Sequence, residues 1–580
     1  MSGMKKLLVY LKDYKRESVL APLFKLLEAF FELLVPLVMA GIIDSGIENG
    51  DRAYILKMGL CLIVLAVVGL TASVTAQFFA AKAAVGFSAR LRHAMFGYIQ
   101  DLEFSDIDGA GTSTLITRMT SDINQVQNGV NMVLRLFLRS PIIVFGAMIM
   151  AFTIDVKCAL VFVVAIPLLA IVVMGITFFT IPLYKKVQTG LDKVLSTTRE
   201  NLTGVRVIRA FHREEQEEAQ FHEENTALLR LQQFVGKISA CMNPVTYVIV
   251  NVAIIVLIYT GAVQVNVGNL SRGEVVAIIN YMSQVLVELV KLANLIITIT
   301  KALACADRVA AVFEIRGERP TVETSMQRSG QGEPYLVFDH VSLTYQGAGA
   351  ETLKDIDFAV NRGETVGIIG GTGSGKSSLV NLLPGFYPTT EGSVRLEGRD
   401  LREIPAEELR GRMGVVPQKA VLFKGTIRSN LLWGNPDATE EDLWRAVSLA
   451  QAREVVEGKD GKLDAEIAQN GRNLSGGQRQ RLTIARALVR RPEILILDDS
   501  ASALDYATDA KLRAALRSME GSMTIFIVSQ RASSIRHADK IIVLDDGEMA
   551  GAGTHEELLE HCAVYQEIYY SQYPEERKQA

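Results

Sequence analysis

The sequence contains little cysteine and no excess of charge of either sign. Its 5 cysteines in 580 residues lie far apart and include no CxxC pair, so neither a disulfide framework nor a zinc site is expected. The 60 Lys and Arg residues nearly balance the 64 Asp and Glu residues, for a net charge of −4, which argues against general nucleic-acid binding. Hydrophobic residues make up 49% of the chain and charged residues 21%. This composition is too apolar for a disordered or highly charged fibrous protein.

The hydrophobic residues are concentrated in the part of the chain before Arg316. The mean hydropathy of the whole chain, +0.22, is low for a protein that lies wholly in lipid, so it is the average of two unlike parts. Each apolar run in the first part reaches the about 20 residues needed to cross a hydrocarbon core. The sequence therefore predicts six membrane spans, at Val19–Ile43, Leu56–Phe79, Met132–Ile154, Ala159–Pro182, Val245–Val265 and Val275–Thr300.

Basic residues ahead of the first span predict its orientation. They place the N-terminus in the cytoplasm, and the first run is too long for a signal peptide. The two long charged segments Lys82–Asn128 and Lys185–Gly236 then fall inside and are expected to continue as helices beyond the bilayer. The sequence predicts a multi-pass protein of the cell membrane. The basic residues are Lys5, Lys6, Lys12, Lys15 and Arg16.

The pattern of apolar residues changes after Arg316–Pro334. This stretch contains Gly, Pro and Ser and has no apolar periodicity, which indicates a linker. We expect a membrane domain over residues 1–315 and a soluble domain over residues 335–580. In the second part, short β-branched runs alternate with helical patterns, as in α/β domains. Strands are expected at Thr365–Ile369, Gly414–Val416, Ile494–Leu497, Thr524–Val528 and Ile541–Leu544.

A phosphate-binding loop follows the first of these apolar runs. Gly370–Ser377 reads GGTGSGKS, a full match to GxxxxGK[ST] between a strand and a helix. Backbone N–H groups of such a loop bind phosphate oxygens, Lys376 neutralises the β- and γ-phosphates, and Ser377 can ligate Mg²⁺. The residues predicted to bind ATP here are Gly370, Gly371, Thr372, Gly373, Ser374, Gly375, Lys376, Ser377 and Ser378.

Two acidic residues follow a second apolar run and complete the expected site. Asp498, at the end of Ile494–Leu497, is predicted to support Mg²⁺, and Asp499 stands where the attacking water would be polarised. An Asp-Asp pair after a strand is weak evidence by itself. Its spacing after the phosphate-binding loop makes it strong.

Between these motifs the chain reads LSGGQ, which resembles the signature of the ATP-binding-cassette (ABC) family. With six preceding spans, the chain is similar to an exporter-type half-transporter. The resemblance implies an all-α six-helix transmembrane domain with long intracellular extensions, followed by an α/β P-loop ATPase domain. It also implies that the signature contacts the γ-phosphate of ATP held by the other subunit. The signature residues are Ser475, Gly476, Gly477 and Gln478.

The resemblance assigns roles to further positions. Tyr345 stands where the family stacks an aromatic ring on adenine, although a half-buried strand residue is the commoner role for such a tyrosine. Gln418 matches a glutamine that senses Mg²⁺ and faces the membrane domain. The family's interface loop, its acidic contact to the membrane domain and its two coupling segments are expected at Ser502–Asp505, Glu466, Leu115–Asp122 and Glu200–Phe211.

Two positions depart from the family pattern. Asp499 replaces the catalytic glutamate and is one methylene shorter, whereas a general base must be within hydrogen-bond reach of the attacking water, about 2.6–3.2 Å between heavy atoms. Gln530 replaces a histidine that contacts the γ-phosphate, and glutamine carries neither a positive charge nor a transferable proton. Both changes fall in the site built on this chain's own phosphate-binding loop, while LSGGQ is intact.

This asymmetry predicts that the chain is the ATP-holding, hydrolysis-impaired subunit of a heterodimer, like the degenerate subunit of a bacterial multidrug exporter. Its partner would be a different ABC half-transporter with Glu and His in its own site. The predicted activity is ATP- and Mg²⁺-dependent efflux of small amphipathic or lipophilic, multidrug-like solutes across the cell membrane by alternating access. The expected partners also include membrane lipid but no nucleic acid. Two alternatives remain open: a slow homodimeric exporter of lipid or peptide, and a nucleotide-binding membrane regulator that transports nothing.

Polar residues within the predicted spans leave two further interpretations open. Charged side chains at membrane depth are costly, so they pair with one another or face a watery cavity. Lys25 with Glu28, and Glu288 with Lys291, are spaced for pairing on one helix face. As a set the residues also predict a cavity lined by spans one, three and six. The set is Lys25, Glu28, Glu32, Arg135, Arg139, Asn280, Ser283, Gln284, Glu288, Lys291 and Asn294.

Overall fold

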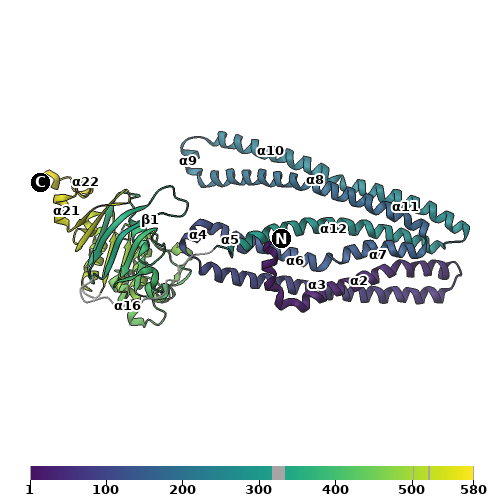
Figure 1. Cartoon of the computed structure of the whole chain (residues 1–580), viewed down its shortest axis with the longest axis horizontal. Helices are drawn as coiled ribbons and strands as arrows, with labels where there is room; N and C mark the ends of the chain where they lie inside the picture. The colour runs from purple at the N-terminus through teal and green to yellow at the C-terminus, as the bar shows by residue number, and fades with distance from the viewer. Residues whose placement is uncertain (1, 316–333, 501, 520–522, 579–580) are drawn as a thin grey trace. The chain divides into compact units, whose positions relative to one another are not determined.

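The computed structural model describes residues 2–315, 334–500, 502–519 and 523–578. It divides into two compact units (Figure 1). The first comprises Met1–Asp101 and Thr112–Ile315, and the second comprises Leu102–Gly111 and Arg316–Ala580. Except for Pro334, the linker predicted at Arg316–Pro334 lies outside the described residues.

The first unit is built from helices. They are α1 (Ser2–Leu7), α2 (Lys15–Gly41), α3 (Arg52–Gln100), α5 (Thr112–Thr117), α6 (Ile123–Leu136), α7 (Arg139–Ile154), α8 (Val156–Thr203), α9 (Val205–Ala210), α10 (Glu214–Ala240), α11 (Met242–Val267) and α12 (Arg272–Val312), with the 3₁₀-helix η1 (Leu8–Tyr14) and the π-helices η2 (Ile42–Ile47) and η3 (Arg118–Asp122).

Six helical stretches of this unit are long and apolar enough to cross a membrane, and each contains one predicted span. The prediction of six spans is therefore confirmed. The stretches have 41 to 54 residues, about twice what a bilayer requires, so they also supply the expected extensions beyond it. Their bounds are Gly3–Ile47, Arg52–Gln100, Thr112–Ile154, Val156–Thr203, Glu214–Val267 and Arg272–Val312.

Polar caps fix where the long helices begin and end. The Asp51 carboxylate accepts hydrogen bonds from the backbone N–H groups of Ala53 and Tyr54 at the start of α3, both at 3.0 Å. Ser271 and Glu274 form a capping box at the start of α12. Gly268, with φ of 83°, ends α11 in a left-handed conformation that glycine adopts without strain. These caps satisfy backbone groups that a helix leaves unpaired at its ends.

Helices α8 and α10 run side by side and are joined by the short helix α9 (Figure 1). The two helices pack on each other, and the Thr197 hydroxyl of α8 donates to Glu224 of α10 at 2.7 Å. This arm carries large apolar side chains that the described part of the chain leaves exposed. Leu202 and Phe211, on either side of α9, are each 72% exposed. Exposed apolar surface of this kind is typical of an interaction site.

Charged residues of three spans form one connected cluster in the first unit. Arg139 of α7 donates to Glu288 of α12 at 2.6 Å and to Glu32 of α2 at 2.7 Å. Two intrahelical pairs extend the cluster, because Lys25 donates to Glu28 and Lys291 donates to Glu288 at 2.8 Å. The structural pairing that the spacing allowed is thus present. Three bases and three acids leave the cluster without net charge.

The third span is interrupted at this cluster. Helices α6 and α7 are separated by a turn at Phe137 and Leu138. Pro141 follows, and a proline inside a helix clashes with the carbonyl four residues earlier and donates no hydrogen bond. The break places Arg139 and Ser140 at the first turn of α7. Both side chains bond to the buried carboxylate of Glu288, which is 2% exposed.

We expect Ser140→Ala to lower the thermal unfolding temperature by a few degrees. The Ser140 hydroxyl donates to Glu288 at 2.8 Å, and an acceptor left unpaired in a buried site costs about 1–3 kcal/mol. The measurement is thermal unfolding of the full-length protein in detergent. Ser283→Ala is the control, because that exposed hydroxyl bonds only to the carbonyl of Ile279 in its own helix. Equal shifts for both variants would contradict the assignment.

The second unit contains two larger sheets. The 4-stranded sheet has the order β2-β1-β4-β5, and the 6-stranded sheet has the order β12-β11-β3-β10-β9-β6. The strands are β1 (Leu336–Leu343), β2 (Leu353–Val360), β3 (Thr365–Gly370), β4 (Glu391–Leu396), β5 (Arg399–Asp400), β6 (Met413–Val416), β9 (Ile494–Asp498), β10 (Thr524–Val528), β11 (Lys540–Asp545) and β12 (Glu548–Gly553), with a short separate pair β7 (Gly425–Thr426) and β8 (Glu466–Ile467).

Helices surround these sheets. They are α4 (Phe104–Ala110), α13 (Lys376–Leu382), α14 (Ala406–Gly411), α15 (Ile427–Leu431), α16 (Glu440–Leu449), α17 (Arg453–Glu457), α18 (Gly476–Val489), α19 (Tyr506–Arg517), α20 (Ala532–Ile535), α21 (His555–His561) and α22 (Ala563–Gln572), with the 3₁₀-helices η4 (Leu401–Glu403), η5 (Lys462–Asp464), η6 (Gln469–Gly471) and η7 (Glu576–Lys578).

The parallel strands of the 6-stranded sheet are buried on both faces. Strands β6, β9, β10, β3 and β11 run parallel to one another, whereas β12 pairs with β11 in the antiparallel direction. Every residue of β9 and β10 is buried. Continuous apolar strands are typical of parallel sheets covered on both sides. Each of the five predicted strands lies within one of these observed strands, so the α/β class expected for this part is confirmed.

Part of the second unit comes from the segment between helices α3 and α5. Helix α4 belongs to this unit: the ring of Phe104 lies 4.4 Å from that of Phe386, and the Tyr387 hydroxyl donates to Asp108 at 2.6 Å. The first coupling segment was expected at Leu115–Asp122, but those residues form the end of α5 and η3 in the first unit. Helix α4, which lies just before them in the sequence, is the part of this loop that belongs to the second unit.

Candidate functional site

The candidate site is built at the carboxyl ends of four neighbouring parallel strands. Strands β3, β10, β9 and β6 are adjacent in the sheet. The phosphate-binding loop follows β3, Gln530 follows β10, Asp498 ends β9 with Asp499 directly after it, and Gln418 follows β6. In open α/β sheets ligands bind at this edge, because the loops of neighbouring strands meet there. The fold thus brings together residues that lie far apart in the sequence.

Two glycines of the loop lie where a side chain would clash with neighbouring atoms. Gly375 has φ of 91°, and a Cβ there would lie 2.7 Å from the Leu353 side chain. A Cβ on Gly370 would lie 2.1 Å from the carbonyl oxygen of Leu544. At Gly371 and Gly373 a Cβ would meet no atom within 4 Å, so these two positions are open on the side where a ligand would approach.

Lys376 lies folded against its own loop. It is 8% exposed, and its ammonium group donates to the carbonyl oxygens of Gly370, at 3.0 Å, and Gly371. Burial lowers the pKa of Lys376, and the nearby charges of Asp499 and Asp498 oppose this shift. A desolvated ammonium ion bonded to neutral carbonyls would gain strongly from an anion placed beside it.

Ser377 and Asp498 are in direct contact, since the serine hydroxyl donates to the carboxylate at 2.9 Å. Burial raises the pKa of Asp498, and the hydrogen bond from Ser377 opposes that shift. A divalent cation would supply the positive charge that this buried carboxylate lacks. A hydroxyl and a carboxylate oxygen are among the ligands that Mg²⁺ prefers, so the pair fits the predicted Mg²⁺ site.

Asp499 has an unusual backbone conformation. Its φ is 44°, its N–H donates to the carbonyl of Val528 at 3.0 Å, and its carboxylate accepts a long hydrogen bond of 3.4 Å from Gln418. Aspartate is enriched several-fold among non-glycine residues with positive φ. The short side chain is therefore compatible with this backbone, and the two residues expected to meet the attacking water and Mg²⁺ lie next to each other.

These residues enclose one cavity with a volume of about 240 Å³. It is walled by the loop, by the strand ends and by Gln530, and it offers open backbone at the glycines, an ammonium group and a hydroxyl–carboxylate pair. This donor set fits a nucleotide phosphate chain with Mg²⁺. The lining residues are Thr352, Thr372, Gly373, Gly375, Lys376, Ser377, Ser378, Gln418, Asp498, Asp499, Val528 and Gln530. The sequence patterns did not single out Thr352, which comes from the loop before β2.

Tyr345 is placed beside this cavity rather than in its wall. Its hydroxyl donates to Ser378 at 2.9 Å, and its ring packs edge-on against that of Tyr387 at 4.9 Å. Tyr345 instead lines a neighbouring cavity of about 530 Å³, together with residues of α4. Tyr387, which bonds to Asp108 of α4, was not found by sequence reasoning because an isolated tyrosine after a helix carries no pattern.

The signature residues lie at the start of α18 and outside this cavity. Ser475 caps the helix and forms a capping box with Gln478: the Gln478 N–H donates to the Ser475 hydroxyl at 3.3 Å. A Cβ on Gly477 would lie 3.0 Å from the carbonyl of Ala503, whereas Gly476 faces open space. Within one chain, the signature and the phosphate-binding loop therefore do not share a site.

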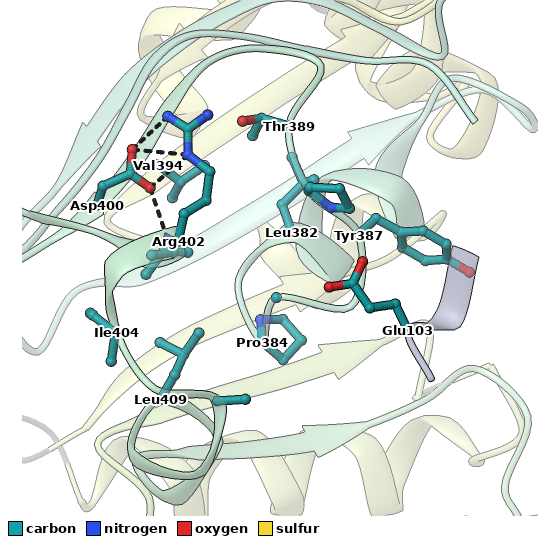
Figure 2. A pocket seen from close by; sticks show the side chains of 14 residues that line it. Glu103, Leu382, Pro384, Tyr387, Thr389, Val394, Asp400, Arg402, Ile404 and Leu409 are labelled. Atoms are coloured by element: carbon teal, nitrogen blue, oxygen red, sulfur yellow. Dashed lines mark hydrogen bonds and ion pairs between the residues drawn. The ribbon is translucent and has the colours of Figure 1, made fainter. Parts of the chain in front are cut away.

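A further cavity of about 310 Å³ lies beside the end of α13. Figure 2 shows its largely apolar wall, with the Asp400–Arg402 ion pair on one side and Glu103, from the segment before α4, on the other. The Asp400 carboxylate accepts from the Arg402 guanidinium at 2.6 Å. Because its charged groups are already paired, this cavity lacks the free donors that a phosphate would need.

Comparison with known families matches both parts of the chain. Residues 18–289 match the family described as ABC transporter transmembrane region, and residues 353–502 match the family described as ABC transporter. Among solved structures, a bacterial Atm1-family ABC exporter with ATP bound is similar with a TM-score of 0.78. It is 23% identical and covers 96% of this chain and 98% of its own. The match establishes the fold.

Curated relatives match nearly end to end. The uncharacterized ABC transporter ATP-binding protein YfiB of Bacillus subtilis is 36% identical over 574 residues, 99% of each chain. The putative multidrug export ATP-binding/permease protein YgaD of the same species is 31% identical, over 98% of this chain and 99% of its own. The ATP-dependent lipid A-core flippase of Chromobacterium violaceum is 30% identical, over 98% and 97%.

Proposed function

The chain belongs to the ABC transporter family, with an exporter's membrane domain and ATPase domain in one polypeptide, and from this premise we propose that it is the ATP-holding subunit of a heterodimeric exporter. Its own site binds MgATP and hydrolyses it slowly, and its signature completes a competent site on a different partner chain. The observation that carries the proposal is the joint presence of Asp499 and Gln530 in the wall of the cavity that contains Lys376.

The chemistry of the two residues supports slow hydrolysis. A carboxylate one methylene shorter stands farther from a water at the γ-phosphate, and general-base catalysis depends on that distance. The Asp499 carboxylate is also engaged by Gln418, and the amide of Gln530 cannot take or give a proton at neutral pH. Lys376 would hold the β- and γ-phosphates, and Ser377, Asp498 and Gln418 would hold Mg²⁺, which shields the negative charge of the phosphates.

Uncovered surfaces of the chain support assembly with a second subunit. Gly476 of the signature faces open space at the N-terminus of α18, an end that favours anions. The arm formed by α8, α9 and α10 presents exposed apolar side chains, among them Phe211. A second half-transporter would cover this arm and place its ATP on the signature.

The cargo we propose is a small amphipathic or lipophilic solute. The printed names of two relatives, a putative multidrug exporter and a lipid A-core flippase, support this chemical class. The neutral cluster around Arg139 provides polar groups among apolar helices without selecting a sign of charge. The basic N-terminal segment supports an orientation with the N-terminus and the ATPase domain in the cytoplasm.

The experiment that tests this proposal measures ATP binding and ATP turnover by the purified full-length chain in lipid nanodiscs. We expect MgATP binding with a turnover that is a small fraction of that of the same chain assembled with its partner half-transporter, and stimulation of the assembled pair by amphipathic solutes. Robust hydrolysis by a verified homodimer of this chain would overturn the heterodimer proposal, because two copies would then form competent sites without a different partner. Nucleotide binding without solute movement in proteoliposomes would favour the membrane regulator.

A further inference from the structure

The last helix of the chain is attached to the segment that carries Gln530. Helix α22 is anchored in the core by the rings of Tyr565 and Tyr569, which are 0% and 2% exposed. At its end, the side chain of Gln572 makes two hydrogen bonds. Its amide nitrogen donates to the carbonyl of Gln530 at 2.8 Å, and its oxygen accepts from the N–H of Ala532 at 2.9 Å.

These two bonds hold the backbone on both sides of Arg531, next to the residue that carries the Gln530 side chain. The N–H of Ala532 is the first of α20, and Arg531, the residue before it, makes no side-chain cap. The orphan N–H groups at a helix start need such a partner, and Gln572 supplies one from another helix. Because the carbonyl of Gln530 is held at the same time, the backbone that carries the Gln530 side chain is held from outside the cavity that this residue lines.

The same segment is connected to the opposite wall. Arg531 donates to the carbonyl of Ser502 at 3.4 Å, and the Ser502 hydroxyl donates to the carbonyl of Asp499 at 2.8 Å. Next to Gln572, the Tyr573 hydroxyl lies 3.3 Å from that of Tyr506, at the start of α19. The end of α22 therefore contacts both segments that carry the two unusual residues of the site.

We propose that Gln572 is a positioning residue of the nucleotide site, which aims Gln530 at the terminal phosphate of ATP. The proposal rests on the proposed function of that site. Gln572 touches no ligand itself and acts through the peptide groups of residues 530–532. Because Gln530 stands where the family contacts the γ-phosphate, the effect of Gln572 applies to ATP, which has this phosphate, and not to ADP.

The chain offers a matched control on the same helix. The Gln566 side chain also donates to a backbone carbonyl, that of Leu559 at 2.7 Å, but this bond stays between α21 and α22. Gln572→Met and Gln566→Met each replace an amide by an apolar side chain of similar length. Since Gln572 is exposed, its replacement is expected to leave folding intact, which thermal unfolding of both variants checks.

The test is calorimetric titration of the full-length protein in nanodiscs with MgATP and with MgADP at low temperature. For Gln572→Met we expect the affinity for MgATP to fall about three- to tenfold, the size of one or two hydrogen bonds. The affinity for MgADP should change less than about twofold, and Gln566→Met should change neither. Gln572→Glu, which keeps an acceptor for Ala532 but loses the donor to Gln530, should resemble Gln572→Met.

Several results would overturn this proposal. Equal losses of ATP and ADP affinity in Gln572→Met would indicate general damage to the unit, and an unchanged ATP affinity would show that Gln530 needs no positioning. A loss of ATP selectivity in Gln566→Met would assign the effect to helix α22 as a whole. If the wild-type chain binds no MgATP, the proposed function itself fails, and that outcome is visible before any variant is compared.

Discussion

Full-length protein with Lys376→Met is expected to bind MgATP about 100-fold more weakly than the wild type. The wild-type ammonium group is buried beside the cavity, and its partners among the described residues are a serine hydroxyl and the neutral carbonyls of its own loop. Charge-assisted hydrogen bonds contribute about 1.5–3 kcal/mol each, and a tenfold change in affinity corresponds to about 1.4 kcal/mol. Loss of two phosphate contacts therefore accounts for the expected change.

Equilibrium titration with MgATP measures this effect, and Lys540→Met is the control. The Lys540 side chain also donates to a backbone carbonyl, that of Ala359 at 2.6 Å, but it does not line the cavity. The control variant should bind MgATP as the wild type does. Comparable binding by Lys376→Met and the wild type would place the nucleotide elsewhere on the chain.

The second large effect is a gain of activity. We expect the combined substitution Asp499→Glu and Gln530→His to raise ATP turnover of the purified chain about 100-fold, because a positioned general base contributes about 10²–10⁴-fold to a rate. The intact signature of a second copy would complete each site in such a preparation. Glutamate is less suited than aspartate to the φ of 44° at position 499, and strain of this kind costs about 1–3 kcal/mol, so the gain stays below the upper limit.

Single substitutions separate the two contributions. Asp499→Glu alone should recover most of the turnover, since it restores the reach of the carboxylate, and Gln530→His alone should recover little. Asp499→Asn serves as the control that preserves size and backbone preference but removes the base. Turnover of the double variant that equals that of the wild type, with MgATP binding retained, would show that the slow step does not depend on these residues.

Much of this architecture follows from local sequence patterns. The six spans and the five strands expected in the soluble part lie where continuous apolar runs placed them, because burial in lipid or in a parallel sheet demands such runs. The phosphate-binding loop could also be predicted, because its glycines are required by the local geometry. At Gly370 and Gly375 the close approach of neighbouring atoms excludes any side chain. The glycines of the motif therefore indicate the shape of the loop directly from the sequence.

Features that depend on distant contacts were not predictable. The spacing of Lys25 with Glu28 indicated local pairs, but the bond from Arg139 to Glu288 joins residues 149 positions apart. The packing of α4 on Phe386 and Tyr387 likewise depends on aromatic contacts that no local pattern contains. The role of Gln572 could not be predicted, because a glutamine at a helix end forms no sequence pattern and its hydrogen-bond partners lie about 40 positions away in the chain.

The origin of α4 has a consequence for how the protein is made. Asp108 and Tyr387 are 279 positions apart in the sequence, so the ribosome releases α4 long before the domain on which it packs. At about 5–20 residues per second of synthesis, Phe104 waits tens of seconds for Phe386. During that interval the Phe104 ring has been made, but the two rings on which it packs, those of Phe386 and Tyr387, have not.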